Sequence, residues 1–126
     1  MGGSRVKAGQ PNADITICLG LAAYRLKRDA PSLRHAINDV LRRASFSAEV
    51  VCYCGFGYTW RGNPEPALDC FRSGEKLMAF NPYAMPMHNG ASIASVMAGN
   101  DDAAIAFAKQ GLRHPMATWL CPQALL

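Results

Sequence analysis

The sequence has no apolar run long enough to cross a membrane, and it has few charged residues. A membrane-spanning helix needs about 20 consecutive apolar residues, and the uncharged stretches of this chain are interrupted by Pro and Gly. Charged residues make up 17% of the 126 residues and apolar residues 50%, which is too apolar for a disordered chain. The composition therefore predicts one soluble globular domain with a single core.

The sequence also lacks a secretory signal, because the start, from Met1 to Lys7, has too short an apolar run. We expect residues 1–13 to form a flexible leader and residues 14–126 to form the domain. The five cysteines are an odd number outside any disulfide framework, which favours reduced thiols and a cytoplasmic location. The net charge of +4 is modest for a nucleic-acid-binding protein, so neither nucleic acid nor membrane is an expected partner.

Several sequence motifs of enzymes are missing. Gly55-Phe-Gly57 is not followed by the third glycine of a dinucleotide-binding fingerprint, and there is no Gly-Lys-Ser/Thr phosphate loop and no Gly-x-Ser-x-Gly turn around a nucleophilic serine. No cofactor is expected, and the motifs identify no reaction.

Apolar runs alternate with amphipathic segments along the chain. Runs typical of buried strands lie at 14–22, 49–54, 76–80, 103–108 and 117–121. Helical patterns begin near Pro31, after Asn63 and at Ala91. We identify no internal repeat. The alternation predicts an α/β domain with a mainly parallel central sheet of about five strands, helices on both faces and an antiparallel last strand.

Ligands of such sheets bind at loops beyond the carboxyl ends of the strands. The expected loops supply cations beside aromatic side chains, among them Tyr24, Arg25, Tyr58, Trp60 and Arg61. This combination suits an anionic, partly flat ligand. Other candidates are Glu65 as a carboxylate for proton transfer, although a first-turn acid also stabilises a helix dipole, and His88 as an acid or base.

From the first expected strand onward, the order of elements resembles the cobalamin-biosynthesis protein CobE and the C-terminal domain of the cobalt-precorrin lactone hydrolase CbiG. The family's Gly-x-Gly-Cys-Arg-Arg turn is similar to Leu19–Arg25, which keeps Gly20 and Arg25, and its Lys-x-x-Glu-x-x-Leu segment is similar to Arg61–Leu68, which keeps Glu65 and Leu68. Its Gly-x-x-Ser-Val-Ala-Glu-Ala-Ala helix resembles Gly90–Ala98, which includes Ser92.

The resemblance implies an accessory protein of cobalamin (vitamin B12) biosynthesis that binds an anionic corrin or precorrin intermediate, with other enzymes of that pathway as further partners. It implies that Arg25 and Arg61 pair with carboxylates and that Tyr24, Tyr58 or Trp60 lies near the ring. Gly20 would allow close approach, and Asn81, His88 and Ser92 would complete the site. The lactone-opening activity of the hydrolase belongs to a longer chain, so the resemblance implies binding rather than hydrolysis.

Two alternatives remain open. A metal- or thiol-dependent protein would use Cys52, Cys54 and His88, joined by Met85 and Met87, although cysteines and methionines in apolar surroundings more often pack as hydrophobic residues. An interaction module would bind a partner protein through the aromatic segment that contains Tyr58 and Trp60.

Overall fold

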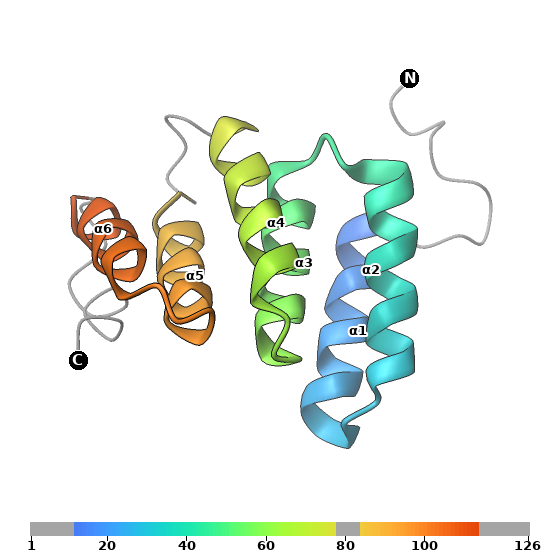
Figure 1. Cartoon of the computed structure of the whole chain (residues 1–126). Helices are drawn as coiled ribbons and strands as arrows, with labels where there is room; N and C mark the ends of the chain where they lie inside the picture. Colours follow the sequence, from blue (N-terminus) through green and yellow to red (C-terminus); the bar gives the residue numbers. More distant parts are fainter. Residues whose placement is uncertain (1–11, 78–83, 114–126) are drawn as a thin grey trace.

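The computed structural model describes residues 12–77 and 84–113, and these form helices joined by short turns (Figure 1). The helices are α1 (Ala13–Lys27), α2 (Ala30–Ala44), α3 (Ala48–Trp60), α4 (Pro64–Leu77), α5 (Ala84–Met97) and α6 (Asp101–Leu112). The described part of the chain contains no strand. The predicted α/β fold with a parallel central sheet is therefore wrong.

The expected strands at 14–22, 49–54 and 103–108 lie within α1, α3 and α6. Lys76 and Leu77 of the expected strand at 76–80 end α4, whereas 78–80 and 117–121 lie outside the described residues. The error is clearest in α3, where Val50, Val51, Cys52 and Cys54 are all buried. A helix buried on several sides is apolar around its circumference, so its sequence shows a continuous apolar run like that of a buried strand.

The turns are set by polar caps and by residues with positive φ. The side chains of Asn12, Asp29 and Asn100 each accept a hydrogen bond from a backbone N–H three residues on, at 2.9 to 3.0 Å. This satisfies a donor that the first helical turn leaves free. Gly62 and Gly99, which follow α3 and α5, have φ values of +80° and +81°, a conformation that glycine adopts without steric cost. These signals define where the helices begin and end.

The helices form three antiparallel hairpins, α1–α2, α3–α4 and α5–α6, which stand side by side with their turns at the same end (Figure 1). The first helices begin at residues 13, 48 and 84, a spacing within the range of helical-hairpin repeats, which is about 33 to 47 residues. Each later hairpin packs through its first helix against both helices of the hairpin before it. The described chain is therefore a short α-solenoid.

The hairpins share their buried positions even though they do not share residue types. The fourth, eighth and eleventh residues of the second helix are buried in every hairpin: Leu33, Ile37 and Val40 in α2, Ala67, Phe71 and Gly74 in α4, and Ala104, Ala108 and Gly111 in α6. The structure thus contains the internal repeat that we do not identify in the sequence.

Close contact within the first two hairpins depends on a glycine at the eighth residue of the first helix. A Cβ atom on Gly20 would lie 2.7 Å from the Cβ of Ala36, and one on Gly55 would lie 2.6 Å from the ring of Phe71. Either side chain would force the two helices apart. In the described ranges, no helix is both long and apolar enough to span a bilayer.

Candidate functional site

The first helices of the hairpins lie on the inner side of the solenoid. Helix α3 contacts both α1 and α5, whereas no Cα atom of α2 lies within 8 Å of one in α4, and the same holds for α4 and α6. Because the first helices are closer together than the second helices, the array curves toward α1, α3 and α5. Solenoids use such concave surfaces to bind other molecules.

The inner face carries exposed side chains at matching positions of α1 and α3. The second residues of these helices are Asp14 and Glu49, the sixth are Cys18 and Tyr53, and the thirteenth are Arg25 and Trp60, and all six are exposed. Burial raises the pKa of Tyr53, and the neighbouring Cys18, Glu49 and Asp14 raise it further. The two helices therefore present acidic side chains at one end of the inner face and a cation beside an aromatic ring at the other.

The cationic end of this face joins two segments that lie far apart in the sequence. The guanidinium carbon of Arg25 lies 4.9 Å from the centre of the Trp60 ring, and the hydroxyl of Tyr24 donates to the carbonyl of Trp60 at 3.4 Å. Arg28 lies over the ring of Tyr24 at 5.6 Å, and Arg61 caps α3. A cation within about 6 Å of a ring is attracted to its face. These residues form one cluster of cations and aromatic rings.

Other residues predicted for the site lie elsewhere. The Nε2 atom of His88 is 3.1 Å from a carboxylate oxygen of Glu75, close to the end of α4 and thus at the opposite end of the hairpins from Arg25. Glu65 is exposed in the first turn of α4. Asn81 lies outside the described residues.

Three predicted residues have packing roles instead. The hydroxyl of the fully buried Ser92 donates to the carbonyl of Ala104 at 2.6 Å, which ties α5 to α6. Gly20 lies in the middle of α1 rather than in a loop. Tyr58 is half-buried between the two core clusters, and burial raises its pKa.

The buried cysteines do not form the metal site that one of the two alternatives requires. Cys54 packs in the core between the first two hairpins, whereas Cys52 packs in the core between the second and third. Two residues that are two apart lie on different sides of a helix, although they would share one face of a strand. Burial raises the pKa of Cys52 to about 12 and that of Cys70 to about 11, so these thiols are protonated at neutral pH. In residues 12–77 and 84–113, no group of three or more His, Cys, Asp or Glu side chains is placed to hold a metal ion.

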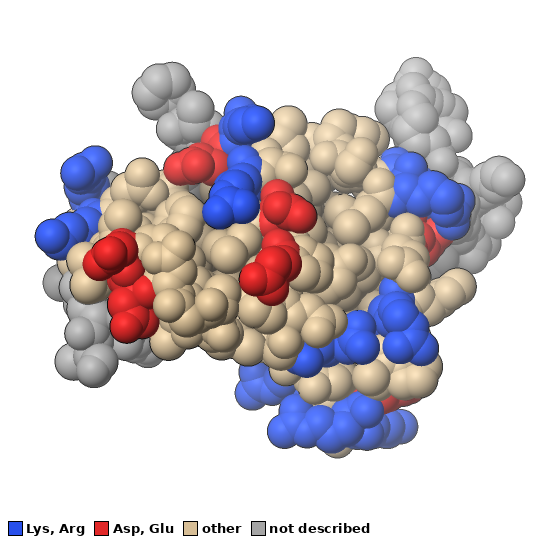
Figure 2. Space-filling model, in the orientation of Figure 1, with Lys and Arg blue, Asp and Glu red and all other residues tan. Residues whose placement is uncertain are grey.

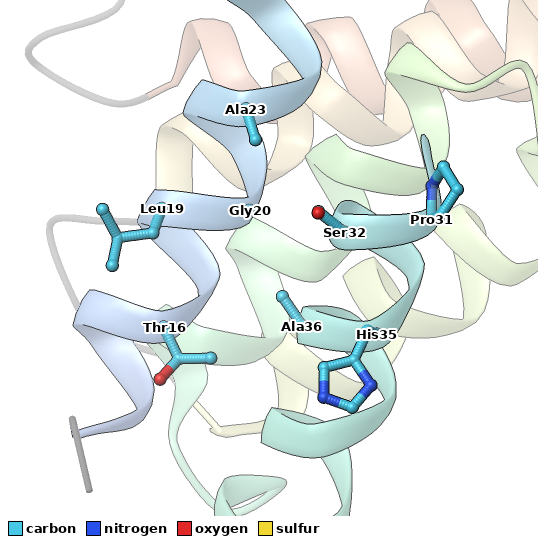
Figure 3. A pocket seen from close by; sticks show the side chains of 8 residues that line it. All are labelled: Thr16, Leu19, Gly20, Ala23, Pro31, Ser32, His35 and Ala36. Atoms are coloured by element: carbon cyan, nitrogen blue, oxygen red, sulfur yellow. The ribbon is translucent and has the colours of Figure 1, made fainter. Parts of the chain in front are cut away.

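The surface of the first hairpin has an open hollow that sequence reasoning missed. It has a volume of about 520 Å³ and lies between α1 and α2 (Figure 3), where it is lined mainly by Leu19, Gly20, Ala23, Pro31, His35 and Ala36. A smaller hollow of about 190 Å³ lies between α2 and α4. Neither contains the predicted cations, and the small residues at 20, 23 and 36 are the only sequence signal for the larger one.

Charge is distributed unevenly between the hairpins. Residues 12–47 contain six Lys and Arg against three Asp and Glu, whereas the described residues from 48 onward contain five against six. Figure 2 shows this difference on the side formed by α2, α4 and α6: basic residues predominate over the first hairpin, whereas basic and acidic residues are mixed over the other two. The cluster around Arg25 and Arg28 lies in the basic part.

Comparison of the chain with family models, with curated proteins and with solved structures finds no match. The similarity to the cobalamin-biosynthesis family implied an α/β fold, which the helical structure contradicts. A role with corrin intermediates stays a prediction that these comparisons do not test.

Proposed function

We propose that this protein is an interaction module that binds an extended segment of a partner protein along the inner face of α1 and α3. The observation that supports this proposal is the shared register of α1 and α3, in which Asp14 and Glu49 lie at one end and Arg25 and Trp60 lie at the other. Exposed side chains that follow α1 and α3 from an acidic end to a cationic end fit an elongated ligand that lies parallel to these helices.

The charges along this face indicate which segment would bind. Asp14 and Arg25 are separated by about 16 Å along α1, at 1.5 Å per residue, and an extended chain covers that length with about five residues. A complementary segment has a basic residue at the end that lies near Asp14 and Glu49 and an acidic residue at the end that lies near Arg25. The stretch between would pack on Cys18 and Tyr53.

The test uses two labelled peptides of the same composition and fluorescence anisotropy. The first has two lysines at one end, two glutamates at the other and four alanine or leucine residues between, and the second has the same charges in alternation. We expect the first to bind at least about fivefold more tightly, because only its charges match both ends of the inner face.

Arg25→Ala should weaken binding of the first peptide at least about fivefold, and added salt should reduce the difference. The matched control is Arg72→Ala on α4. The Arg72 side chain is 59% exposed, and its guanidinium nitrogen lies 3.8 Å from a carboxylate oxygen of Asp69, which is a weak ion pair. Equal affinity for both peptides, no binding of either, or an equal effect of the two substitutions contradicts the proposal.

A further inference from the structure

The first helix of the array exposes large apolar side chains on one side. Ile15, Leu19 and Leu26 of α1 are 51%, 62% and 81% exposed. They are the third, seventh and fourteenth residues of the helix and therefore lie along one stripe of its surface. Scattered apolar side chains are ordinary on a protein surface, but a contiguous apolar patch marks a contact site.

The same positions are buried in the later hairpins. The third and seventh residues of α3, Val50 and Cys54, are 1% and 0% exposed, and both belong to the core shared with α1 and α2. The seventh residue of α5, Gly90, is buried against the ring of Phe71 in the preceding hairpin. Ile15 and Leu19 thus occupy positions that pack against a neighbouring hairpin wherever the described chain provides one.

A hollow beside Leu19 completes a surface able to receive a side chain. Leu19 stands at its rim, and Gly20, Ala23 and Ala36 lie at its centre between α1 and α2 (Figure 3). None of the residues that line the hollow is Lys, Arg, Asp or Glu. The hollow and the adjoining stripe form one surface, the open face, which consists of Ile15, Leu19, Ala23 and Leu26 of α1 with Pro31 and His35 of α2.

We propose that the open face binds the open face of a second copy of this chain, so that α1 and α2 of the two copies form a four-helix bundle across a twofold axis. A twofold contact requires a self-complementary surface, and this one presents a protruding leucine next to a hollow lined by small residues. No Lys, Arg, Asp or Glu side chain lines the hollow, so the centre of the contact would bury none of them.

Sedimentation velocity of the whole chain tests the proposal. We expect the wild-type protein to sediment at twice the 13.6 kDa mass of one chain at a concentration of about 50 μM. Leu19→Glu should give a monomer, since each copy would bury a carboxylate without a partner. Its circular dichroism should match that of the wild type, because the side chain is exposed in the single chain.

The matched control is Phe46→Glu in the turn between α2 and α3. Phe46 is 74% exposed and lies outside the open face, so this variant should remain a dimer. A wild-type protein that is monomeric up to about 100 μM overturns the proposal, as does a dimer that survives in the Leu19→Glu, Leu26→Glu double variant. Binding of the peptide to the inner face should be unchanged by Leu19→Glu, so this proposal and the proposed function fail separately.

Discussion

The first and second hairpins have the same geometry but are held together by different side chains. In α2 the repeated core positions carry Leu33, Ile37 and Val40, whereas in α4 the same positions carry Ala67, Phe71 and Gly74. The first hairpin thus distributes its packing over several aliphatic side chains. The second concentrates it in one aromatic ring surrounded by small residues. The same helical arrangement can be specified by either kind of packing, but the packing of the second hairpin depends on the single residue Phe71.

Phe71→Ala should be the most damaging substitution in the second hairpin. The ring of Phe71 contacts Phe56 at a centroid distance of 5.4 Å and lies close to the Cα positions of both Gly55 and Gly90. It therefore fills the space between the second and third hairpins. Removal of a buried phenylalanine costs about 3 to 5 kcal/mol. Denaturant unfolding should show a loss of that size in the free energy of unfolding.

The two hairpins should differ in which helices lose stability when a core side chain is removed. In Phe71→Ala, amide hydrogen exchange should accelerate first in α5 and α6, because their contact with the second hairpin depends on the ring. Leu33→Ala, which also removes a fully buried side chain, should instead accelerate exchange in α1, α2 and α3. If both variants show the same pattern of exchange, the hairpins are not held together by separate cores.

Gly20→Ala should have a smaller effect and tests close packing within the first hairpin. The new Cβ would lie 2.7 Å from the Cβ of Ala36, a contact that the backbone must relieve. Overpacking of this kind lowers the free energy of unfolding by about 1 to 3 kcal/mol. The higher helix propensity of alanine raises it by up to about 1 kcal/mol. We expect a net loss of about 1 kcal/mol in chemical denaturation.

The double variant Gly20→Ala, Ala36→Gly provides the control for that contact. It places the methyl group on the other helix, so part of the loss caused by Gly20→Ala should be recovered. A double-mutant cycle measures this coupling. Strictly additive effects would show that the two helices do not meet at these positions.

The sequence predicts the amphipathic helices better than the buried ones. Leu33, Ile37 and Val40 recur at helical spacing with polar residues between them, and α2 begins within a residue of the expected position. Helix α3 is buried against several neighbours, so Val50, Val51, Cys52 and Cys54 form an almost continuous apolar run that hides the helical period. The repeat escapes detection because equivalent positions, such as Leu33 and Ala67, differ in side-chain size.

The candidate site could be predicted in part, for a physical reason that does not depend on the fold class. The expected loops contain Arg25 and Trp60. Elements that run parallel have their ends at one edge, whether they are strands or helices. These residues therefore lie together, with the Arg25 guanidinium 4.9 Å from the Trp60 ring. His88 was expected after a third strand, but it lies near the beginning of α5. It is consequently at the opposite end of the molecule.

The smallest expected effect concerns Asp29, the N-cap residue of α2. The hydroxyl and the backbone N–H of Ser32 both donate to Asp29, and these hydrogen bonds lower the pKa of that carboxyl from its ordinary value of 3.8. A carboxyl whose pKa is lower in the folded state stabilises the fold above its unfolded pKa, and this stabilisation is lost as the pH falls through the folded value.

Asp29→Ala should therefore lower the midpoint of thermal unfolding at pH 7, and its difference from the wild type should narrow below a pH of about 4. Ser47 caps α3 with a hydroxyl that does not titrate, so the effect of Ser47→Ala should depend much less on pH. Asp29→Asn keeps the acceptor without the charge and should lie between the wild type and Asp29→Ala at pH 7. A difference between Asp29→Ala and the wild type that stays constant from pH 7 to pH 3 would mean that the Asp29 charge contributes nothing, and that the cap acts only through its hydrogen bonds.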